Sequence, residues 1–400
     1  MAWRNIWRNK TRSVVIILSI AIGLFSGIAL LALYQGMMKG RVRTVINSEV
    51  GHMQIHHPEF KKDYKPEYTI QDGQNILKKL TATPEIKLAA PRSITTGMLS
   101  TPGGSAGVQI NGVIPEQEYL ASQLKKKIIE GNAFNPKKKN QIIIGKKLAE
   151  KFKLNVGSKL VLTSIDSSEE IVSGAYRVIS IYQSDNAPLD ELNVYVTMND
   201  LNKMLKIENE FHEIVLILHQ DNLIDTLSQR LSKQFIATKI ETWREISPET
   251  NLLVKTTDQY SYIILVIIML ALAFGIINTM LMAILERTRE IGMMLALGTN
   301  RIRIFFLVLF ETFFLTFTGT PIGIFSSWTV ISYFNQKGIN LSGMGNEMMK
   351  SFGFGSMIYP EFPTDKILNV FLIVFFTALI SCLFPALKVL RLQPVEALRG

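Results

Sequence analysis

Residues 261–285, SYIILVIIMLALAFGIINTMLMAIL, decide the fold because they form a long apolar stretch without a charged side chain. Such a stretch is typical of a helix that crosses about 30 Å of hydrocarbon. Three further stretches share this character, at residues 13–34, 304–334 and 367–387, and Glu311 is their only charged residue. The sequence therefore predicts a membrane protein with four transmembrane helices. This excludes a soluble enzyme, a disordered chain and a secreted disulfide scaffold.

The distribution of charge indicates the topology. The chain carries a net charge of +10, and its short segments 1–12, 286–303 and 388–400 hold 11 basic and 3 acidic residues. Short basic segments remain in the cytoplasm. We therefore expect both termini and the loop at 286–303 on the cytoplasmic side, with the segments 35–260 and 335–366 on the other side. The basic excess reports topology, so no nucleic-acid partner is expected.

The long segment 35–260 alternates strand and helix patterns. Strands are predicted at Met53–His56, Gly107–Ile114, Gln141–Ile144, Lys159–Ile165, Tyr176–Tyr182, Asn193–Val196 and Glu213–Leu218. Helices are predicted at Thr69–Ala82, Lys146–Phe152, Met198–Leu205 and Asn222–Phe235, with loops at Thr101–Gly107, Asn132–Asn140 and Ser164–Gly174. The fold class is thus membrane α-helical, with a large α+β domain inserted between helices 1 and 2. Residues 41–51 and 244–260 are candidates for helical extensions of those two spans.

Motifs of catalysis or metal binding are nearly absent from the sequence. A phosphate-binding loop of the form GxxxxGK[ST] does not occur in the chain, and the only cysteine is Cys382. His52 and His56 would share one face of a strand next to His57, which makes a zinc site conceivable. Because no cysteine or well-placed carboxylate completes that set, we interpret the histidines as polar residues of the strand. No catalytic, cofactor or metal residue is predicted.

The loop between spans 2 and 3 reads ERTREIGMMLALGT at residues 286–299. Ile291, Met294 and Leu295 recur at helical spacing and form an apolar stripe, and Gly298 is placed to end the helix. A basic loop without further structure would explain the arginines but not the stripe or the glycine. We therefore expect a short amphipathic helix at the membrane surface. The first twelve residues, with Trp3, Ile6 and Trp7, are either a second interfacial helix or ordinary flanking sequence.

The loop at 286–299, together with the C-terminal LQPVEALR at 392–399, resembles the FtsX-like permease domain of MacB-type (type VII) ABC transporters. The N-terminal AWRNIWRNK at 2–10 and the external IIIGKKLA at 142–149 and LNVGSKL at 154–160 are similar to other parts of the same family. The resemblance implies a permease subunit in the inner membrane, with a periplasmic domain after the first span.

The resemblance also implies a coupling helix that docks on a separate ATPase. Carried over by position, it comprises Glu286, Arg287, Thr288, Arg289, Glu290, Ile291, Gly292, Met293, Met294, Leu297 and Gly298. The chain itself would then bind no cofactor, and ATP and magnesium would be bound by that partner. The implied partners are a dimer of the ATPase, a second permease subunit, membrane lipids and a periplasmic lipoprotein carrier.

Two residues inside the third span are candidates for a functional role. Glu311 is either a gate or a contact of Arg301 or Arg303, or a carboxylate solvated near the interface. Pro321, between Gly319 and Gly323, is expected to kink the helix because it lacks a backbone donor. The small residues between Ala21 and Ala29 in the first span suit either close helix packing or an acyl-lined cleft.

Three functions are compatible with the resemblance. Stand-alone permeases with a large periplasmic domain are similar to the Lol permeases, which extract lipoproteins from the inner membrane for sorting to the outer membrane. The alternatives are a MacB-like export permease that works by mechanical transmission, and an FtsX-like regulator of cell-wall hydrolases. The large external domain argues against the regulator, since regulators of that family carry a smaller one.

Overall fold

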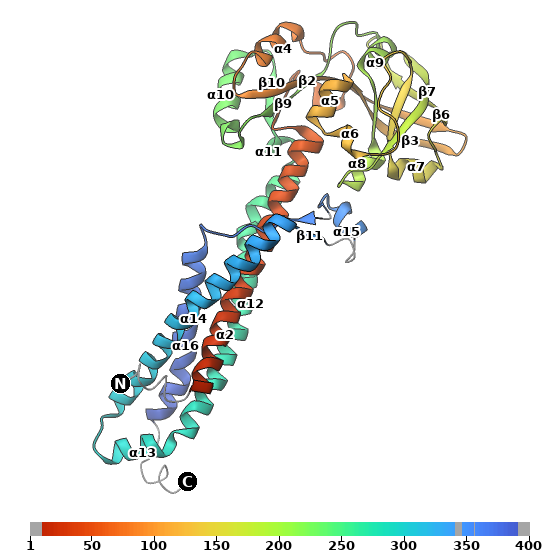
Figure 1. Cartoon of the computed structure of the whole chain (residues 1–400). Coiled ribbons are helices and arrows are strands. Elements are labelled where there is room, and N and C mark those ends of the chain that lie inside the picture. Colours follow the sequence, from red (N-terminus) through yellow and green to blue (C-terminus); the bar gives the residue numbers. More distant parts are fainter. Residues whose placement is uncertain (1–9, 341–345, 356, 391–400) are drawn as a thin grey trace. The chain divides into compact units, whose positions relative to one another are not determined.

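The computed structural model describes residues 10–340, 346–355 and 357–390 (Figure 1). The proposed interfacial helix at residues 1–12 and the C-terminal motif at 392–399 therefore lie mostly or wholly outside the described residues. The chain divides into two compact units. The first comprises residues 1–38, 254–340 and 357–400, and the second comprises residues 39–253 and 341–356.

Among its described residues, the first unit contains four helices that are long and apolar enough to cross a membrane, as predicted. They are α2 (Lys10–Thr44), α12 (Pro248–Glu286), α14 (Arg301–Lys337) and α16 (Ile367–Leu390). A short helix, α13 (Thr288–Ala296), connects α12 to α14, and a two-stranded ribbon of β11 (Ile339–Asn340) and β12 (Met357–Ile358) lies between α14 and α16 in the sequence. Both α2 and α12 are longer than the apolar stretches inside them. Each therefore continues from the first unit into the residues of the second.

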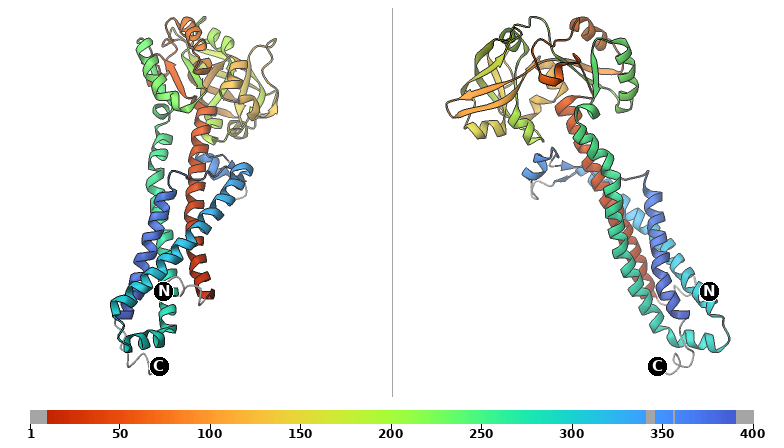
Figure 2. Two further views of the ribbon diagram at one scale, coloured as in Figure 1. Left: turned by 60° about the vertical axis from the view of Figure 1, so that its left-hand side comes forward. Right: turned by 180° about the vertical axis from the view of Figure 1, so that it is seen from behind.

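The four helices run alongside one another (Figure 2), and small residues allow them to approach closely. A Cβ atom at Gly323 of α14 would lie 2.8 Å from the Cβ of Leu24 on α2, and one at Gly23 of α2 would lie 3.0 Å from the side chain of Leu272 on α12. Lipid tails are as apolar as the side chains of these helices, so the hydrophobic effect does not drive helices together in a membrane. Association depends instead on close van der Waals packing of this kind. The small residues of the first span thus serve helix packing, and the structure gives no support to an acyl-lined cleft there.

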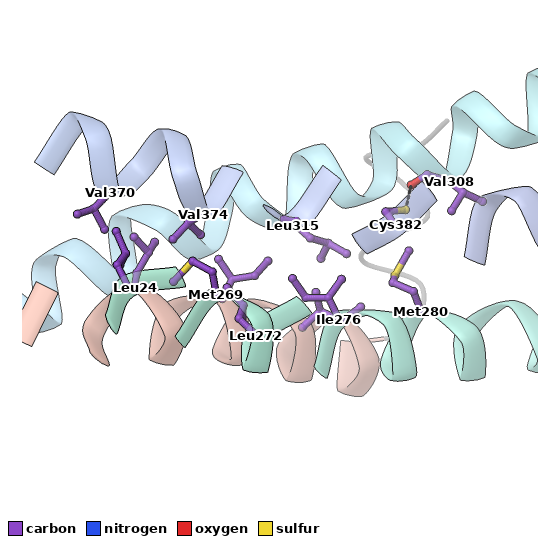
Figure 3. Packing of buried hydrophobic residues seen from close by; sticks show 14 of the residues in the cluster. Leu24, Met269, Leu272, Ile276, Met280, Val308, Leu315, Val370, Val374 and Cys382 are labelled. Atoms are coloured by element: carbon purple, nitrogen blue, oxygen red, sulfur yellow. Dashed lines mark hydrogen bonds between the residues drawn. The ribbon is translucent and has the colours of Figure 1, made fainter. Parts of the chain in front are cut away.

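The centre of the bundle is filled with apolar side chains from all four helices. Leu24, Met269, Leu315 and Val374 are each at most 4% exposed, and Figure 3 shows them interleaved with their neighbours. The sulfur of Cys382 is buried in the same cluster and accepts a hydrogen bond from the Thr312 hydroxyl at 2.9 Å. The faces that point away from this centre are also apolar, as a lipid environment requires. The bundle of this single chain is packed through its centre.

The second unit is an α+β domain built on one ten-stranded sheet. Its strands are β1 (Met53–His56), β2 (Ile86–Thr101), β3 (Gly104–Val113), β4 (Ile128–Gly131), β5 (Gln141–Gly145), β6 (Lys159–Ile165), β7 (Ile171–Tyr182), β8 (Asn193–Thr197), β9 (Glu213–Leu218) and β10 (Lys239–Thr242). Its helices are α3 (Phe60–Asp63), α4 (Gly73–Thr81), α5 (Pro115–Ala121), α6 (Leu124–Lys127), α7 (Lys146–Phe152), α8 (Ala187–Leu192), α9 (Met198–Leu205), α10 (Ile224–Gln234), α11 (Trp243–Ile246) and α15 (Asn346–Ser351), with short π and 3₁₀ turns η1 (Val45–Val50) and η2 (Asp221–Leu223).

Six of the strands close into a barrel. The pairs run from β2 to β3, β8, β5, β7 and β6, and β6 pairs with β2 again. Alternate residues point inward, as Ile142 and Ile144 do on β5, and pack on Leu148 of α7 and Leu201 of α9. Closure leaves these strands without an open edge, which makes the barrel a stiff body. The sequence predicted an α+β domain but not this closure.

Strand β2 joins the barrel to a second lobe. Its first half pairs with β9, which continues to β1 and β10, and α4 and α10 pack against this part of the sheet. Strand β2 was not predicted from the sequence, and Pro91, a residue type that is rare inside strands, lies within it. The structure explains why proline is tolerated at this position. The carbonyl of the neighbouring Arg92 points toward the β9 side, so the backbone nitrogen of Pro91 points toward the β3 side. Pairing with β3 begins only at Arg92, so this nitrogen needs no hydrogen-bond partner there. The predicted loop at Ser164–Gly174 was also too long, because β6 and β7 extend to Ile165 and Ile171.

The imidazole of His212 connects the two lobes of this domain beside β2. Its Nδ1 accepts the backbone N–H of Ile94 at 3.0 Å, so its Nε2 carries the proton and donates to the carbonyl of Pro66 at 3.0 Å. Burial lowers the pKa of His212 from 6.5 to about 4, although the bond to Pro66 opposes the shift. The folded domain thus holds this side chain neutral and fully hydrogen-bonded.

We predict that His212 makes the domain less stable in acid. Between pH 6.5 and 4, the unfolded chain binds a proton at this side chain that the folded chain excludes. The free energy of unfolding should therefore decrease by about 3 kcal/mol as the pH is lowered from 6.5 to 4. His212→Asn keeps an acceptor for Ile94 but does not titrate. Thermal unfolding of the detergent-solubilised chain at pH 7 and pH 5 should show a smaller acid loss in the variant. Equal losses would contradict the assignment.

Candidate functional site: the connection between α12 and α14

Helix α12 ends at Glu286, and a single residue separates it from α13. Arg287 leaves the helical conformation, with φ −98° and ψ 12°. The hydroxyl of Thr288 then donates to the carbonyl oxygens of Leu285 at 2.8 Å and Ile284 at 3.2 Å, near the end of α12. The last carbonyl groups of a helix have no backbone N–H partner within that helix. The hydroxyl of Thr288 therefore supplies a hydrogen-bond donor to two carbonyls at the end of α12.

The other end of α13 is fixed by Gly298. This glycine has a φ of +86°, and its N–H bonds to Leu295 O while the N–H of Thr299 bonds to Met294 O, both at 3.0 Å. The two bonds form the glycine-terminated Schellman arrangement expected from the sequence. Asn300 follows at once as the N-cap of α14, where its side-chain oxygen accepts the N–H of Ile302 at 2.9 Å. Both ends of α13 are therefore defined by local sequence.

The predicted apolar stripe of α13 faces the helix bundle. Ile291 and Gly292 are buried, and Met294 and Leu295 are partly buried against the bundle core. The opposite face is exposed and mixes apolar with charged residues. Met293 is 54% and Leu297 82% exposed, next to the exposed side chains of Glu286, Arg289 and Glu290. We call the exposed residues 289, 290, 293 and 297, together with residue 286 at the end of α12, the outer face of α13.

A buried ion pair holds the start of α13 against α14. Nη1 of Arg287 lies 3.2 Å from both carboxylate oxygens of Glu311, and the two side chains are only 12% and 10% exposed. A cavity of about 40 Å³ borders the pair, with Ser13 of α2 and Glu290 of α13 in its wall. The expected partners of Glu311 were wrong, since Arg301 instead donates to the carbonyl of Leu390 at 2.9 Å. The alternative of a solvated carboxylate is also wrong, because Glu311 lies inside the bundle.

Pro321 lies within α14 and borders an apolar groove beside α16. α14 is helical on both sides of this residue. The groove has a volume of about 500 Å³ and is lined by Phe317, Thr320, Pro321, Ile324, Thr364, Ile367, Leu368 and Phe371. Sequence periodicity could not reveal it, because it forms between two helices that are distant in the sequence.

The three clustered histidines have separate partners in the structure. His52 contacts Asp221 at 3.0 Å, His56 contacts Glu241 at 3.1 Å, and the ring of His57 stacks on Tyr68. Among residues 10–340, 346–355 and 357–390, no group of three or more ligating side chains is placed to hold a metal ion. The histidines therefore act as polar contacts within the domain.

Family models match both units of the chain. A MacB-like periplasmic core domain matches residues 13–234, which is more than half of the chain, and an FtsX-like permease C-terminal domain matches residues 262–394. The chain belongs to the family of FtsX-like permeases with a MacB-like periplasmic core domain. It is therefore a multi-pass membrane component of an ABC transporter, with an extracytoplasmic domain and an ATPase as partner.

Relatives with different functions resemble the chain equally well. The lipoprotein-releasing system transmembrane protein LolC of Neisseria meningitidis is 22% identical over 97% of this chain and 94% of its own length. The macrolide export ATP-binding/permease protein MacB of Campylobacter jejuni is also 22% identical, over 100% of this chain and 60% of its own length. The periplasmic region of MacB from Actinobacillus actinomycetemcomitans, solved as a crystal structure, covers 52% of this chain and 95% of its own at 13% identity, with a TM-score of 0.36.

The ion pair of this permease predicts a pattern of stabilities. Arg287→Met and Glu311→Leu should each lower the free energy of unfolding by about 3 kcal/mol, because each leaves one charge buried without its partner. The double variant should be more stable than the sum of the two losses implies. Thermal unfolding in nanodiscs measures all four proteins of this cycle. Strictly additive losses would show that the two side chains do not depend on each other.

Proposed function

We propose that this permease couples ATP hydrolysis by a cytoplasmic ATPase dimer to movement of its periplasmic domain, and that it extracts lipoproteins from the inner membrane. The observation that supports coupling is the outer face of α13. It exposes Met293 and Leu297 beside charged residues on a helix whose other face is buried in the bundle. Large apolar side chains at a charged aqueous surface are typical of a contact with another protein.

The proposal includes a topology and a set of partners. With α13 in the cytoplasm, both chain termini are cytoplasmic and residues 39–253 are periplasmic, as the basic short segments indicate. A second permease subunit would complete the assembly, and lipids and a periplasmic lipoprotein carrier would be further partners. ATP and magnesium would be bound by the ATPase, while the coupling residues from Glu286 to Gly298 would receive its movement.

Movement, rather than a pore, is the mode of action that the bundle favours. A displacement of α13 acts directly on α14, because Arg287 and Glu311 join them, and on α12, from which α13 is separated by one residue. Helices α2 and α12 each run from the bundle into residues of the periplasmic unit without a gap in the helix. A helix transmits axial movement along its length because its backbone hydrogen bonds are satisfied internally.

A lipid-modified substrate is supported by the groove between α14 and α16. Its walls are phenylalanine, isoleucine, leucine and proline, with only two threonines, and both helices are long and apolar enough to cross a membrane. An acyl chain is the ligand whose chemistry matches such walls in a membrane. MacB-like export is the second candidate, because MacB matches the whole chain at the same identity as LolC.

The docking prediction concerns the outer face of α13. Leu297→Asp and Met293→Asp should reduce co-purification with the ATPase at least tenfold, because each places a charge in an apolar contact, while the chain still inserts in the membrane. Leu120→Asp is the matched control, since Leu120 of α5 is 71% exposed and lies in the other unit. Wild-type recovery of the ATPase with both α13 variants would contradict the coupling assignment.

The substrate prediction concerns the groove. Ile324→Trp should fill it and leave lipoproteins in the inner membrane, as depletion of the whole protein should. Ile322→Trp is the matched control, because Ile322 is 50% exposed on the same helix but does not line the groove. Fractionation of labelled lipoproteins measures the outcome. Normal sorting after depletion would reject lipoprotein extraction and favour the export function.

A further inference from the structure

Helix α2 is followed directly by a different helical form within the second unit. Residues Val45–Val50 form the π-helix η1, and the N–H of Gly51 bonds to Ile46 O, five residues earlier, at 3.0 Å. Such turns are rare, and they occur frequently at functional sites. Val45 and Ile46 are buried, so this turn is part of the packed domain and not a frayed helix end.

An ion pair spans the change from α-helix to π-helix. Nη1 of Arg41 lies 2.5 Å from Oε1 of Glu49, and both side chains are less than 10% exposed. In a regular α-helix, residues eight apart are separated by about 80° around the axis. The wider π turn rotates less per residue, which brings Glu49 back to the face of Arg41. The pair and the π turn therefore depend on each other.

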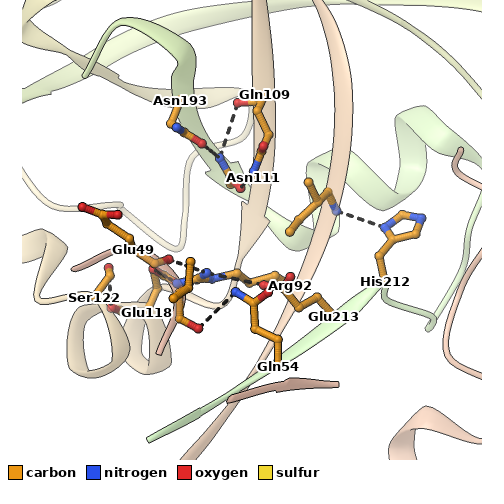
Figure 4. A network of polar contacts seen from close by, with 12 residues as sticks. Glu49, Gln54, Arg92, Gln109, Asn111, Glu118, Ser122, Asn193, His212 and Glu213 are labelled. Carbon is orange, nitrogen blue, oxygen red and sulfur yellow. Dashed lines mark hydrogen bonds and ion pairs between the residues drawn. The ribbon is translucent and has the colours of Figure 1, made fainter. Parts of the chain in front are cut away.

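Glu49 also bonds to α8 and to β2, and Figure 4 shows its contact with Arg92 of β2. Its Oε1 accepts from Nδ2 of Asn186, the N-cap of α8, at 2.9 Å, and its carbonyl accepts from Nη1 of Arg92 on β2 at 3.4 Å. Arg92 is held in turn by two hydrogen bonds of 2.8 Å to the carboxylate of Glu118 on α5. The end of the first transmembrane helix is thus bonded, through one residue, to β2 and to α8.

Arg41 contacts the connection between α14 and α16. The guanidinium lies 2.7 Å from the position that a Cβ atom would take at Gly353, which has a φ of +72°. Gly353 follows α15 and ends it, with the N–H of Phe354 bonded to Met349 O at 2.9 Å. Any larger residue at 353 would displace the guanidinium. All of these residues belong to the same compact unit.

We propose that Arg41 and Glu49 are the positioning residues through which movement of α2, and of the connection between α14 and α16, is passed to the periplasmic domain. This inference rests on the proposed coupling function. Its physical basis is that a buried, hydrogen-bonded ion pair is directional and stiff, whereas the apolar contacts around it can slide. Arg41 of α2 contacts the connection between α14 and α16, and Glu49 is bonded to β2 and to α8. Without the pair, hydrolysis would continue but its movement would be lost at η1.

The test uses the permease reconstituted with its ATPase and measures substrate released per ATP hydrolysed. Arg41→Met/Glu49→Gln removes both charges, so neither remains buried alone. Release per ATP should fall at least fivefold while association with the ATPase is unchanged, and Arg41→Lys should fall less. Lys151→Met/Glu191→Gln is the matched control, because it removes an exposed pair at 2.6 Å in the same domain. Wild-type release per ATP in the double variant would overturn the inference.

A second measurement separates this inference from the proposed function. Hydrogen exchange on the permease alone needs neither ATPase nor substrate. The double variant should speed exchange at Val45–Gly51 at least tenfold and leave the barrel strands unchanged, and Glu49→Gln, which leaves Arg41 buried without a charged partner, should speed exchange in the same place at least as much. If exchange at η1 is the same in the double variant as in the wild-type chain, the inference is overturned, even if the wild-type permease is found to couple ATP hydrolysis to release. If the wild-type chain binds no ATPase, the proposed function fails and exchange alone decides the role of the pair.

Discussion

The ion pair between Arg287 and Glu311 is the interaction on which the α13 end of the helix bundle depends. A charged group inside an apolar bundle is costly unless it is paired, so each side chain fixes the position of the other. Arg287 is also the single residue between α12 and α13. The pair therefore ties the junction between the two helices to α14, and α13 lies with Ile291 buried and Leu297 exposed. Without it, the amphipathic pattern of α13 would still favour a surface helix, but not one tied to α14.

The remaining parts of the fold suit a protein that transmits movement. The bundle of the single chain is closed by apolar side chains, with glycines where α2 meets α12 and α14. The globular unit is a closed barrel joined through β2 to a second lobe, and closure makes that unit resist deformation. Stiff bodies connected by continuous helices move as units. The polar contacts at η1 follow α2 directly and are buried within the second unit, whereas a surface ion pair is solvated and contributes little.

Local patterns in the sequence predicted local structure well. The apolar stretches predicted the four spans, and short runs rich in β-forming residues predicted β6 and β9 with their observed bounds. The stripe of α13 and the glycine that ends it were both correct, because a helix face and a left-handed glycine are set by neighbouring residues. The FtsX-like resemblance also rested on a contiguous motif. The coupling role of that motif stays a prediction.

Features that depend on distant residues were missed. Nothing near Glu311 in the sequence indicates Arg287, 24 residues earlier and across a turn. Strand β2 was hidden by Pro91, whose tolerance depends on where β3 begins to pair. Barrel closure, the groove beside Pro321 and the pairing of Arg41 with Glu49 each require elements that only the folded chain brings together. A π turn has no sequence signature of its own, so the last of these was beyond any analysis of periodicity.

The central claim is that the outer face of α13 receives the movement of a partner ATPase. Site-specific photocrosslinking from position 297, in cells that express the chain with its ATPase, tests this claim most directly. We expect a crosslink to the ATPase from position 297 and none from position 120, which lies on α5 of the second unit. Crosslinks from position 297 only to lipid, or only to another copy of the permease, would contradict a coupling role for the outer face of α13.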